Sequence, residues 1–147
     1  MQALNDSRVE AALLAYFDAL TRRDKQAWLA LLARNAILHE PVGALPAEHD
    51  EGREQVWQML TGPFASLSVQ AEQTFYGGSG AAVKWRARGQ AAATSGAAST
   101  TPRRSITFEG ISIFELDAEG KIQTVMSYWD PAEMLIRLAD EGVAADH

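Results

Sequence analysis

The order of helix-like and strand-like patterns in this sequence predicts a single α+β domain. As far as Gly62, apolar residues recur at spacings of three and four, which is typical of amphipathic helices. From Leu67 onward they tend to alternate with polar residues, which is typical of half-buried strands. The length of 147 residues suits one ordinary domain, and no repeat or linker divides the chain. We therefore expect residues 1–147 to form one domain of helices packed against a mainly antiparallel sheet.

Three helices and one short strand are predicted in the N-terminal part. The first helix covers Asp6–Thr21, and Asp24 is placed to cap the start of the second. The prolines and glycines that follow indicate loop and strand, and the apolar centre of Ala36–Glu40 predicts a short strand there. The third helix begins near Glu51 and ends at Gly62.

The remaining chain predicts four strands and a closing helix. Gln90–Thr101 is rich in Ala, Ser, Thr and Gly without periodicity, which predicts a flexible loop, with a lid over a pocket as the alternative. Asp117–Gly120 predicts a tight turn, and the cap, proline and acid of Asp130–Glu133 start a short helix that runs to about Asp140. The four strands are predicted at Leu67–Phe75, Ala81–Arg88, Ser105–Leu116 and Ile122–Trp129.

Composition excludes several classes of function. The net charge of −6 and the pI of about 5.0 disfavour nucleic acid as a partner, because phosphate binding needs a basic surface. The chain has no cysteine, and its three histidines lack the spacing of metal ligands, so we expect no metal site. No glycine loop of the kind that binds phosphate is apparent, so we expect no cofactor. No run approaches the ~18 apolar residues of a membrane span, and no signal peptide is apparent, which predicts a cytoplasmic protein.

Two residues are candidates for chemistry. Glu40 ends a predicted strand among apolar neighbours, where burial would raise the pKa of its carboxyl group towards a range useful for proton transfer. A solvated loop acid is the structural alternative at this position. Tyr16 lies on the apolar face of the first helix, either as a core aromatic residue or as a donor to a developing oxyanion.

Three segments carry a resemblance to a known family. They are His39–Gly43 (HEPVG), Glu51–Val56 (EGREQV) and Gly120–Trp129 (GKIQTVMSYW). Together they resemble the ketosteroid isomerases and, more broadly, the SnoaL-like members of the nuclear-transport-factor-2-like superfamily, over Ala11 to about Leu135. The resemblance implies a cone in which a curved sheet surrounds three helices and a deep pocket, often dimerised through the outer face of the sheet.

The resemblance also implies roles for particular residues. Ketosteroid isomerases use a carboxylate base and an oxyanion hole made of a tyrosine and a protonated aspartic acid. The base falls on Glu40, the tyrosine on Tyr16 and the aspartic acid on Ser112, which departs from the family pattern. Two supporting tyrosines of some members fall on Leu32 and Leu60, so this side of the pocket is expected to be more apolar than in a dedicated steroid isomerase.

Other residues complete the expected site. Asp130 is a further candidate acid, at the pocket mouth or as a helix cap, and Glu109 is expected to be exposed or at an interface. Judged singly, each pocket residue is better explained as part of the core than as a ligand contact. The expected pocket lining is Trp57, Met59, Val83, Trp85, Phe108, Phe114, Met126 and Trp129.

Three functional hypotheses remain open at this stage. The first is a cofactor-independent isomerase that moves a double bond in a hydrophobic ketone, enone or polyketide-like intermediate, with Glu40 as the base. The second is a SnoaL-like cyclase or dehydratase, in which Asp130 gains importance. The third is a non-catalytic domain that binds a small molecule, in which Glu40 is only a buried, hydrogen-bonded acid. The partners expected are a hydrophobic small molecule and a second copy of the chain.

Overall fold

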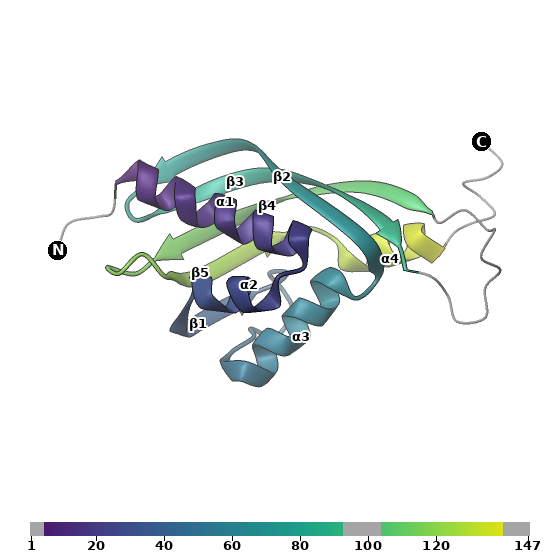
Figure 1. Cartoon of the computed structure of the whole chain (residues 1–147), viewed down its shortest axis with the longest axis horizontal. Coiled ribbons are helices and arrows are strands. Elements are labelled where there is room, and N and C mark those ends of the chain that lie inside the picture. The colour runs from purple at the N-terminus through teal and green to yellow at the C-terminus, as the bar shows by residue number, and fades with distance from the viewer. Residues whose placement is uncertain (1–4, 93–103, 140–147) are drawn as a thin grey trace.

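The computed structural model describes residues 5–92 and 104–139. In it, four helices pack with one curved, unclosed sheet of five strands (Figure 1). The helix α1 lies lengthwise against the sheet, and α4 lies at one end of it (Figure 1). The elements are α1 (Asp6–Arg22), α2 (Lys25–Leu31), β1 (Leu32–His39), α3 (His49–Thr61), β2 (Phe64–Gly77), β3 (Gly80–Ala91), β4 (Ser105–Leu116), β5 (Ile122–Tyr128) and α4 (Pro131–Ala139).

The sheet is mixed, with the strand order β1-β5-β4-β3-β2. The strands β2, β3, β4 and β5 form antiparallel pairs, whereas β1 lies parallel to β5. The last strand is therefore inserted between the first strand and the central ones, which brings the end of β1 beside the end of β5. This arrangement confirms the predicted α+β class with a curved, mainly antiparallel sheet around the helices.

Helix caps follow the sequence closely. The Asp24 carboxylate accepts a hydrogen bond from the Ala27 amide at the start of α2, over 3.1 Å. The Asp130 carboxylate does the same for the Glu133 amide at the start of α4, over 3.0 Å. Each side chain satisfies a backbone donor that a helix leaves free in its first turn. Asn5 caps α1, one residue before the predicted start.

Several element boundaries differ from the sequence expectation; β2, for example, covers Phe64–Gly77 rather than Leu67–Phe75. The first strand begins at Leu32 rather than Ala36, directly after α2, because buried Leu32 already pairs with Ile122 of β5. The loop expected from residue 90 begins later, because β3 continues to Ala91, whose amide donates to the Arg104 carbonyl over 2.7 Å. Most of that loop, from residue 93 to residue 101, lies outside the described residues.

The inner face of the sheet and the helices share one core. The predicted alternation in β3 is confirmed: Val83, Trp85 and Ala87 are buried, whereas the residues between them are exposed. The Tyr16 ring of α1 makes an edge contact with Phe114 of β4, with centroids 5.1 Å apart. This packing holds α1, and with it Tyr16, against the centre of the sheet.

Gly110 of β4 permits the close approach of the strands and side chains that form the site. A β-carbon on Gly110 would lie 2.6 Å from Trp85 Cζ2, 2.7 Å from the Tyr128 carbonyl oxygen and 2.9 Å from Trp129 Cβ. Carbon contacts this short are strongly repulsive, and neither a carbonyl oxygen nor a β-carbon can rotate away. A side chain at this position would therefore displace both tryptophans.

We expect Gly110→Ala to lower the free energy of unfolding by about 1–3 kcal/mol, the usual cost of overpacking. Gly77→Ala is the matched control, because a β-carbon there has no heavy atom within 4 Å. It should change stability by less than about 0.5 kcal/mol, as surface substitutions usually do. Urea unfolding followed by tryptophan emission measures both. Equal effects of the two substitutions would contradict this account of Gly110.

Candidate active site

Glu40 is the first residue after β1 and is held by backbone contacts on both sides. Before it, Leu38 exchanges two backbone hydrogen bonds with Ala47, over 3.0 and 2.8 Å. After it, a cis peptide bond leads to Pro41, and the Val42 amide donates to the Ser127 carbonyl over 2.8 Å. The loop that carries Glu40 is thus attached to β5, and its side chain faces the side chains at the end of that strand.

Two neutral donors bind the Glu40 carboxylate. Ser127 Oγ donates to Oε2 over 2.7 Å, and Trp129 Nε1 donates to Oε1 over 2.5 Å. Within residues 5–92 and 104–139, no lysine or arginine forms an ion pair with it. Uncharged donors stabilise a carboxylate without fixing it in the ionised form as strongly as a cation would.

The hydrogen bonds continue from Ser127 into the sheet. Ser127 Oγ lies 2.7 Å from Ser112 Oγ, and Trp85 Nε1 donates to Ser112 Oγ over 2.9 Å. When Glu40 is ionised, Ser127 gives its only proton to Glu40, so it accepts from Ser112. In this arrangement Ser112 supports the Glu40 carboxylate through Ser127. The oxyanion role that the resemblance implies for Ser112 stays a prediction.

Burial raises the pKa of Glu40 to about 7, and the hydrogen bonds from Trp129 and Ser127 oppose that rise. Removal of water disfavours the charged carboxylate more than two neutral donors can offset. Close to neutral pH, the protonated and ionised forms are therefore both populated. A group with this property can take up a proton and return it within one reaction cycle.

Tyr16 presents an uncommitted hydroxyl group. Its side chain is buried, and neither its hydroxyl oxygen nor the neighbouring Trp28 Nε1 has a standard hydrogen-bond partner. Burial and the negative charge of Glu40 raise the pKa of Tyr16 well above its usual value, although the nearby indole of Trp28 acts in the opposite direction. The phenol therefore keeps its proton at neutral pH and remains a hydrogen-bond donor.

Glu40, Tyr16, Ser112 and Ser127 line one narrow cavity of about 40 Å³. A water molecule needs roughly 10–15 Å³ measured in this way, so the space holds only a few small atoms. A ring-sized ligand enters only when the lining side chains move. The rest of the lining is apolar and consists of Phe17, Leu20, Leu60, Leu67, Val69, Trp85, Ala87 and Phe108.

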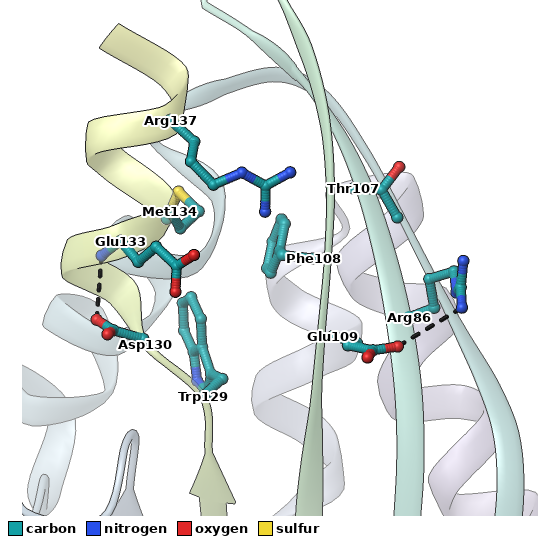
Figure 2. Close-up of a pocket in the computed structure, with 9 residues that line it drawn as sticks. All are labelled: Arg86, Thr107, Phe108, Glu109, Trp129, Asp130, Glu133, Met134 and Arg137. Carbon is teal, nitrogen blue, oxygen red and sulfur yellow. Dashed lines mark hydrogen bonds and ion pairs between the residues drawn. The ribbon is translucent and has the colours of Figure 1, made fainter. Parts of the chain in front are cut away.

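A second, wider cleft of about 380 Å³ lies between β4 and α4 (Figure 2). Its lining includes Asp130, Glu133 and Arg137 on the helix side, and Glu109, paired with Arg86, on the sheet side (Figure 2).

Two stacked aromatic rings stand between the cleft and the Glu40 site. Phe108 and Trp129 have centroids 5.6 Å apart and both line the cleft. Phe108 also lines the small cavity, and Trp129 contacts Glu40. Asp130 therefore lies in the outer cleft, where it caps α4, and not in the cavity of Glu40.

The expected pocket residues fall into three groups. Trp85, Phe108 and Trp129 lie at the cavity or contact Glu40. Met126 lies on the outer face of the sheet, because the neighbouring Val125 and Ser127 are the buried residues of β5. The remaining four line neither the cavity nor the cleft: Trp57, Val83 and Phe114 are buried in the core, and Met59 is half-buried on α3.

Ser127 is the principal site residue absent from the sequence prediction. Its alternation with Val125 and its place two residues before Trp129 indicate that it faces inward, but a single serine in a strand carries no chemical signature. The sequence does not give the register of β5 against β4, and only this register places Ser127 directly opposite Ser112.

Neither a metal site nor a membrane-spanning helix is found in the described residues. Among the described residues, no group of three or more histidine and acidic side chains is arranged to hold a metal ion. No helix in the same part of the chain is long and apolar enough to cross a membrane.

The fold is a curved α+β arrangement in which an acid and a phenol line one mainly apolar cavity. The SnoaL-like domain model matches residues 13–125, and the chain belongs to this family within the nuclear-transport-factor-2-like superfamily. The resemblance stated from the sequence is thereby confirmed.

Several known proteins are similar to this chain. A steroid Δ-isomerase of Nocardioides simplex is 27% identical over 130 residues, which cover 88% of this chain and 96% of the relative. The epoxide hydrolase/cyclase-like enzyme SalBIII, which functions in pyran ring formation in polyether salinomycin, aligns with a TM-score of 0.70 at 18% identity, over 86% and 93% of the two chains. A Mycobacterium tuberculosis protein in complex with estradiol-17β-hemisuccinate aligns with a TM-score of 0.68 at 17% identity, over 84% and 94%.

The raised pKa of Glu40 makes stability depend on pH. The folded-state pKa of about 7 lies above the value of 4.5 for a free side chain, so ionisation of Glu40 opposes folding as the pH rises through this range. At 1.36 kcal/mol per pH unit, the loss over these roughly 2.5 units is about 3 kcal/mol. We expect the free energy of unfolding of the native protein, relative to Glu40→Gln, to fall by this amount between acidic and mildly alkaline pH. Urea unfolding of both proteins measures it, and parallel pH profiles would show that the pKa of Glu40 is not raised.

Proposed function

We propose that this protein is a cofactor-independent isomerase that shifts a double bond in a hydrophobic ketone or enone. The observation that carries the proposal is the pairing of Glu40, whose pKa is raised to about 7, with an uncommitted Tyr16 hydroxyl on one apolar cavity. A base that titrates near neutral pH suits removal and return of the same proton. A buried donor without a protein acceptor is available to a substrate oxygen.

The reaction would proceed in two proton transfers. Glu40 removes a proton from the carbon next to the carbonyl group, and the C–H electron pair forms a carbon–carbon double bond while the carbonyl oxygen becomes an enolate. Tyr16 donates a hydrogen bond to that oxygen. Protonated Glu40 then returns the proton to the far carbon of the original double bond, the enolate collapses to the ketone, and the double bond is moved into conjugation. Atoms and charge balance without a co-reactant.

The apolar lining supports a hydrophobic, ring-bearing substrate. Apart from the four polar residues, the cavity offers only aliphatic and aromatic side chains, including Phe17, Trp85 and Phe108. Such a surface favours carbon skeletons over charged metabolites. The steroid Δ-isomerase relative and the steroid-bound structural neighbour agree with this class of substrate.

A second candidate function uses the same cavity for acid catalysis. With a pKa of about 7, a substantial fraction of Glu40 carries a proton near neutral pH and is able to protonate a leaving oxygen or an epoxide. The similarity to SalBIII favours cyclisation or dehydration of a biosynthetic intermediate as this alternative. Asp130 would contribute only if the cleft and the cavity join during binding.

Glu40→Gln should lower isomerisation of a β,γ-unsaturated steroid ketone by about 10²–10⁴-fold, the usual contribution of a general base. Tyr16→Phe should lower it by about 10²–10³-fold, as loss of an oxyanion donor does. Absorbance of the conjugated product follows the rate. Glu48→Gln is the control, because Glu48 is an exposed carboxylate without a side-chain cap hydrogen bond at the start of α3.

The outcomes separate the hypotheses. Full turnover by the Glu40→Gln protein would refute the base assignment. Ligand binding without turnover in the native protein would favour the non-catalytic binding domain. Turnover of an epoxide or hydroxylated polyketide, with none of the enone, would favour the cyclase or dehydratase.

We also propose that the chain forms a homodimer through the outer face of its sheet. Neighbouring strands expose an apolar patch there, made of Ile111, Ile113, Met126 and Tyr128, in which Ile111 pairs with Tyr128 and Ile113 with Met126. Arg86 and Glu109 form an ion pair beside it. A two-fold axis places the same surface of both copies in contact, and adjacent charges of opposite sign suit such a self-complementary surface.

Ile111→Lys should convert the dimer to a monomer of 16.0 kDa, because two lysines would meet near the axis in an apolar interface. Leu14→Lys is the control, because Leu14 is equally exposed but lies on α1. Light scattering coupled to gel filtration gives both masses. A native protein that is already monomeric would exclude the dimer.

A further inference from the structure

The hydrogen-bond chain that supports Glu40 has a direction, and that direction depends on one proton. Its members are Trp85, Ser112, Ser127 and Glu40, joined over 2.9, 2.7 and 2.7 Å. Ser112 is 4% exposed and Ser127 1% exposed, so bulk water does not compete for their hydroxyl groups. Each hydroxyl has one proton to donate, and the choice of partner for one fixes the choice for the next.

When Glu40 is ionised, every proton in the chain points towards it. The carboxylate only accepts, so Ser127 donates to Glu40 Oε2 and Ser112 donates to Ser127. The indole N–H of Trp85 only donates, and it occupies a lone pair of Ser112. Ser112 then lines the cavity without a proton to offer to a ligand.

When Glu40 is protonated, the same distances favour the opposite order. Trp129 Nε1 can only donate and lies 2.5 Å from Oε1, so the added proton belongs on Oε2. The partner of Oε2 is Ser127 Oγ, which accepts this proton and turns its own towards Ser112. Ser112 now accepts from both Ser127 and Trp85, and the part of the chain that the structure describes offers its proton no other acceptor. The proton turns towards the cavity.

We propose that proton uptake by Glu40 reverses this chain and releases the Ser112 hydroxyl to donate to the substrate oxygen. The inference rests on the proposed isomerase function and extends it. No bond between heavy atoms changes, because only O–H groups rotate. Ser112 would be a catalytic residue, while Ser127 and Trp85 would be positioning residues that act through it.

The reversal would make Ser112 available as a second oxyanion donor only after Glu40 has removed the substrate proton. Before proton transfer the substrate oxygen is a neutral carbonyl, and Ser112 is committed to the base. After transfer the oxygen is an enolate, and Ser112 joins Tyr16 in stabilising it, so the interaction exists only where it accelerates the reaction. Tyr16 is the other titratable residue that lines the cavity, and no lysine or arginine lines it within residues 5–92 and 104–139.

The Glu40→Gln variant imitates the hydrogen bonding of protonated Glu40 but cannot transfer a proton. Trp129 holds the amide oxygen at the Oε1 position, so the amide nitrogen lies where Oε2 was and donates to Ser127. The chain is then fixed in its reversed order. The probe is 4-nitrophenolate, a planar oxyanion, at a mildly alkaline pH at which Glu40 of the native protein is ionised. The dissociation constant is measured from the absorbance change of the probe.

The experiment is a double-mutant cycle of the native protein, Ser112→Ala, Glu40→Gln and the double variant. Ser112→Ala should weaken probe binding by less than about 2-fold when Glu40 is present, and by about 10-fold in the Glu40→Gln background, as expected for one hydrogen bond to an anion. Ser127→Ala removes the acceptor of the Ser112 proton, so in the Ser127→Ala background Ser112→Ala should weaken probe binding by about 10-fold even when Glu40 is present. If Glu40→Gln acted only by removing the negative charge of the carboxylate, it would strengthen probe binding, but Ser112→Ala would have the same effect in both backgrounds.

Two results would overturn the inference. One is an equal effect of Ser112→Ala in both backgrounds, and the other is the absence of probe binding to the Glu40→Gln protein. If Ser112→Ala does not fold, Ser127→Ala provides the comparison: it should strengthen probe binding when Glu40 is present, because it frees the Ser112 proton, and change binding by less than about 2-fold in the Glu40→Gln background. The cycle measures binding only, so its outcome is independent of the proposed reaction. Full turnover by the Glu40→Gln protein would refute the role of Glu40 as base and leave the reversal intact. An equal effect of Ser112→Ala in both backgrounds would refute the reversal and leave the role of Glu40 intact.

Discussion

The site depends on the solvation of one carboxylate by two uncharged donors. Glu40 is removed from water at the end of β1, and Ser127 and Trp129 replace part of its hydration. An arginine or lysine in their place would hold the group ionised, and full exposure would leave its pKa near 4.5. The intermediate degree of stabilisation is what leaves both protonation states accessible. Each proposed chemical role of the cavity follows from that balance.

The fold creates this environment through the parallel pairing of β1 with β5. That pairing places the residue after β1 beside the last residues of β5, and the antiparallel pairing with β4 adds Ser112 behind Ser127. Gly110 then allows the two tryptophans to approach from β3 and from the end of β5. The helix α1 contributes Tyr16 from the opposite side of the core. The chemical groups come from five separate elements, and only their packing makes them neighbours.

The sequence predicted the elements well because local patterns determine them. Spacing, caps and turn residues located all four helices and all five strands, and Asp24 and Asp130 cap the helices they were expected to cap. The sequence also indicated Glu40 and Tyr16 through family resemblance. It did not reveal Ser127 or the outward direction of Met126, since both depend on strand register. Nor did it show that Asp130 lies outside the cavity, because the Phe108–Trp129 stack that separates the two brings together β4 and the end of β5, which the sequence alone does not place side by side.

The hydrogen bonds to Glu40 join residues 87 and 89 positions apart in the chain. Contacts of such large sequence separation close long loops, and they form late and cooperatively in folding. Because β5 follows β1–β4 in the chain, a fragment that ends before β5 lacks both donors. Glu40 acquires its complete environment only when β5 inserts beside β1, and its titration therefore reports that these two strands have paired.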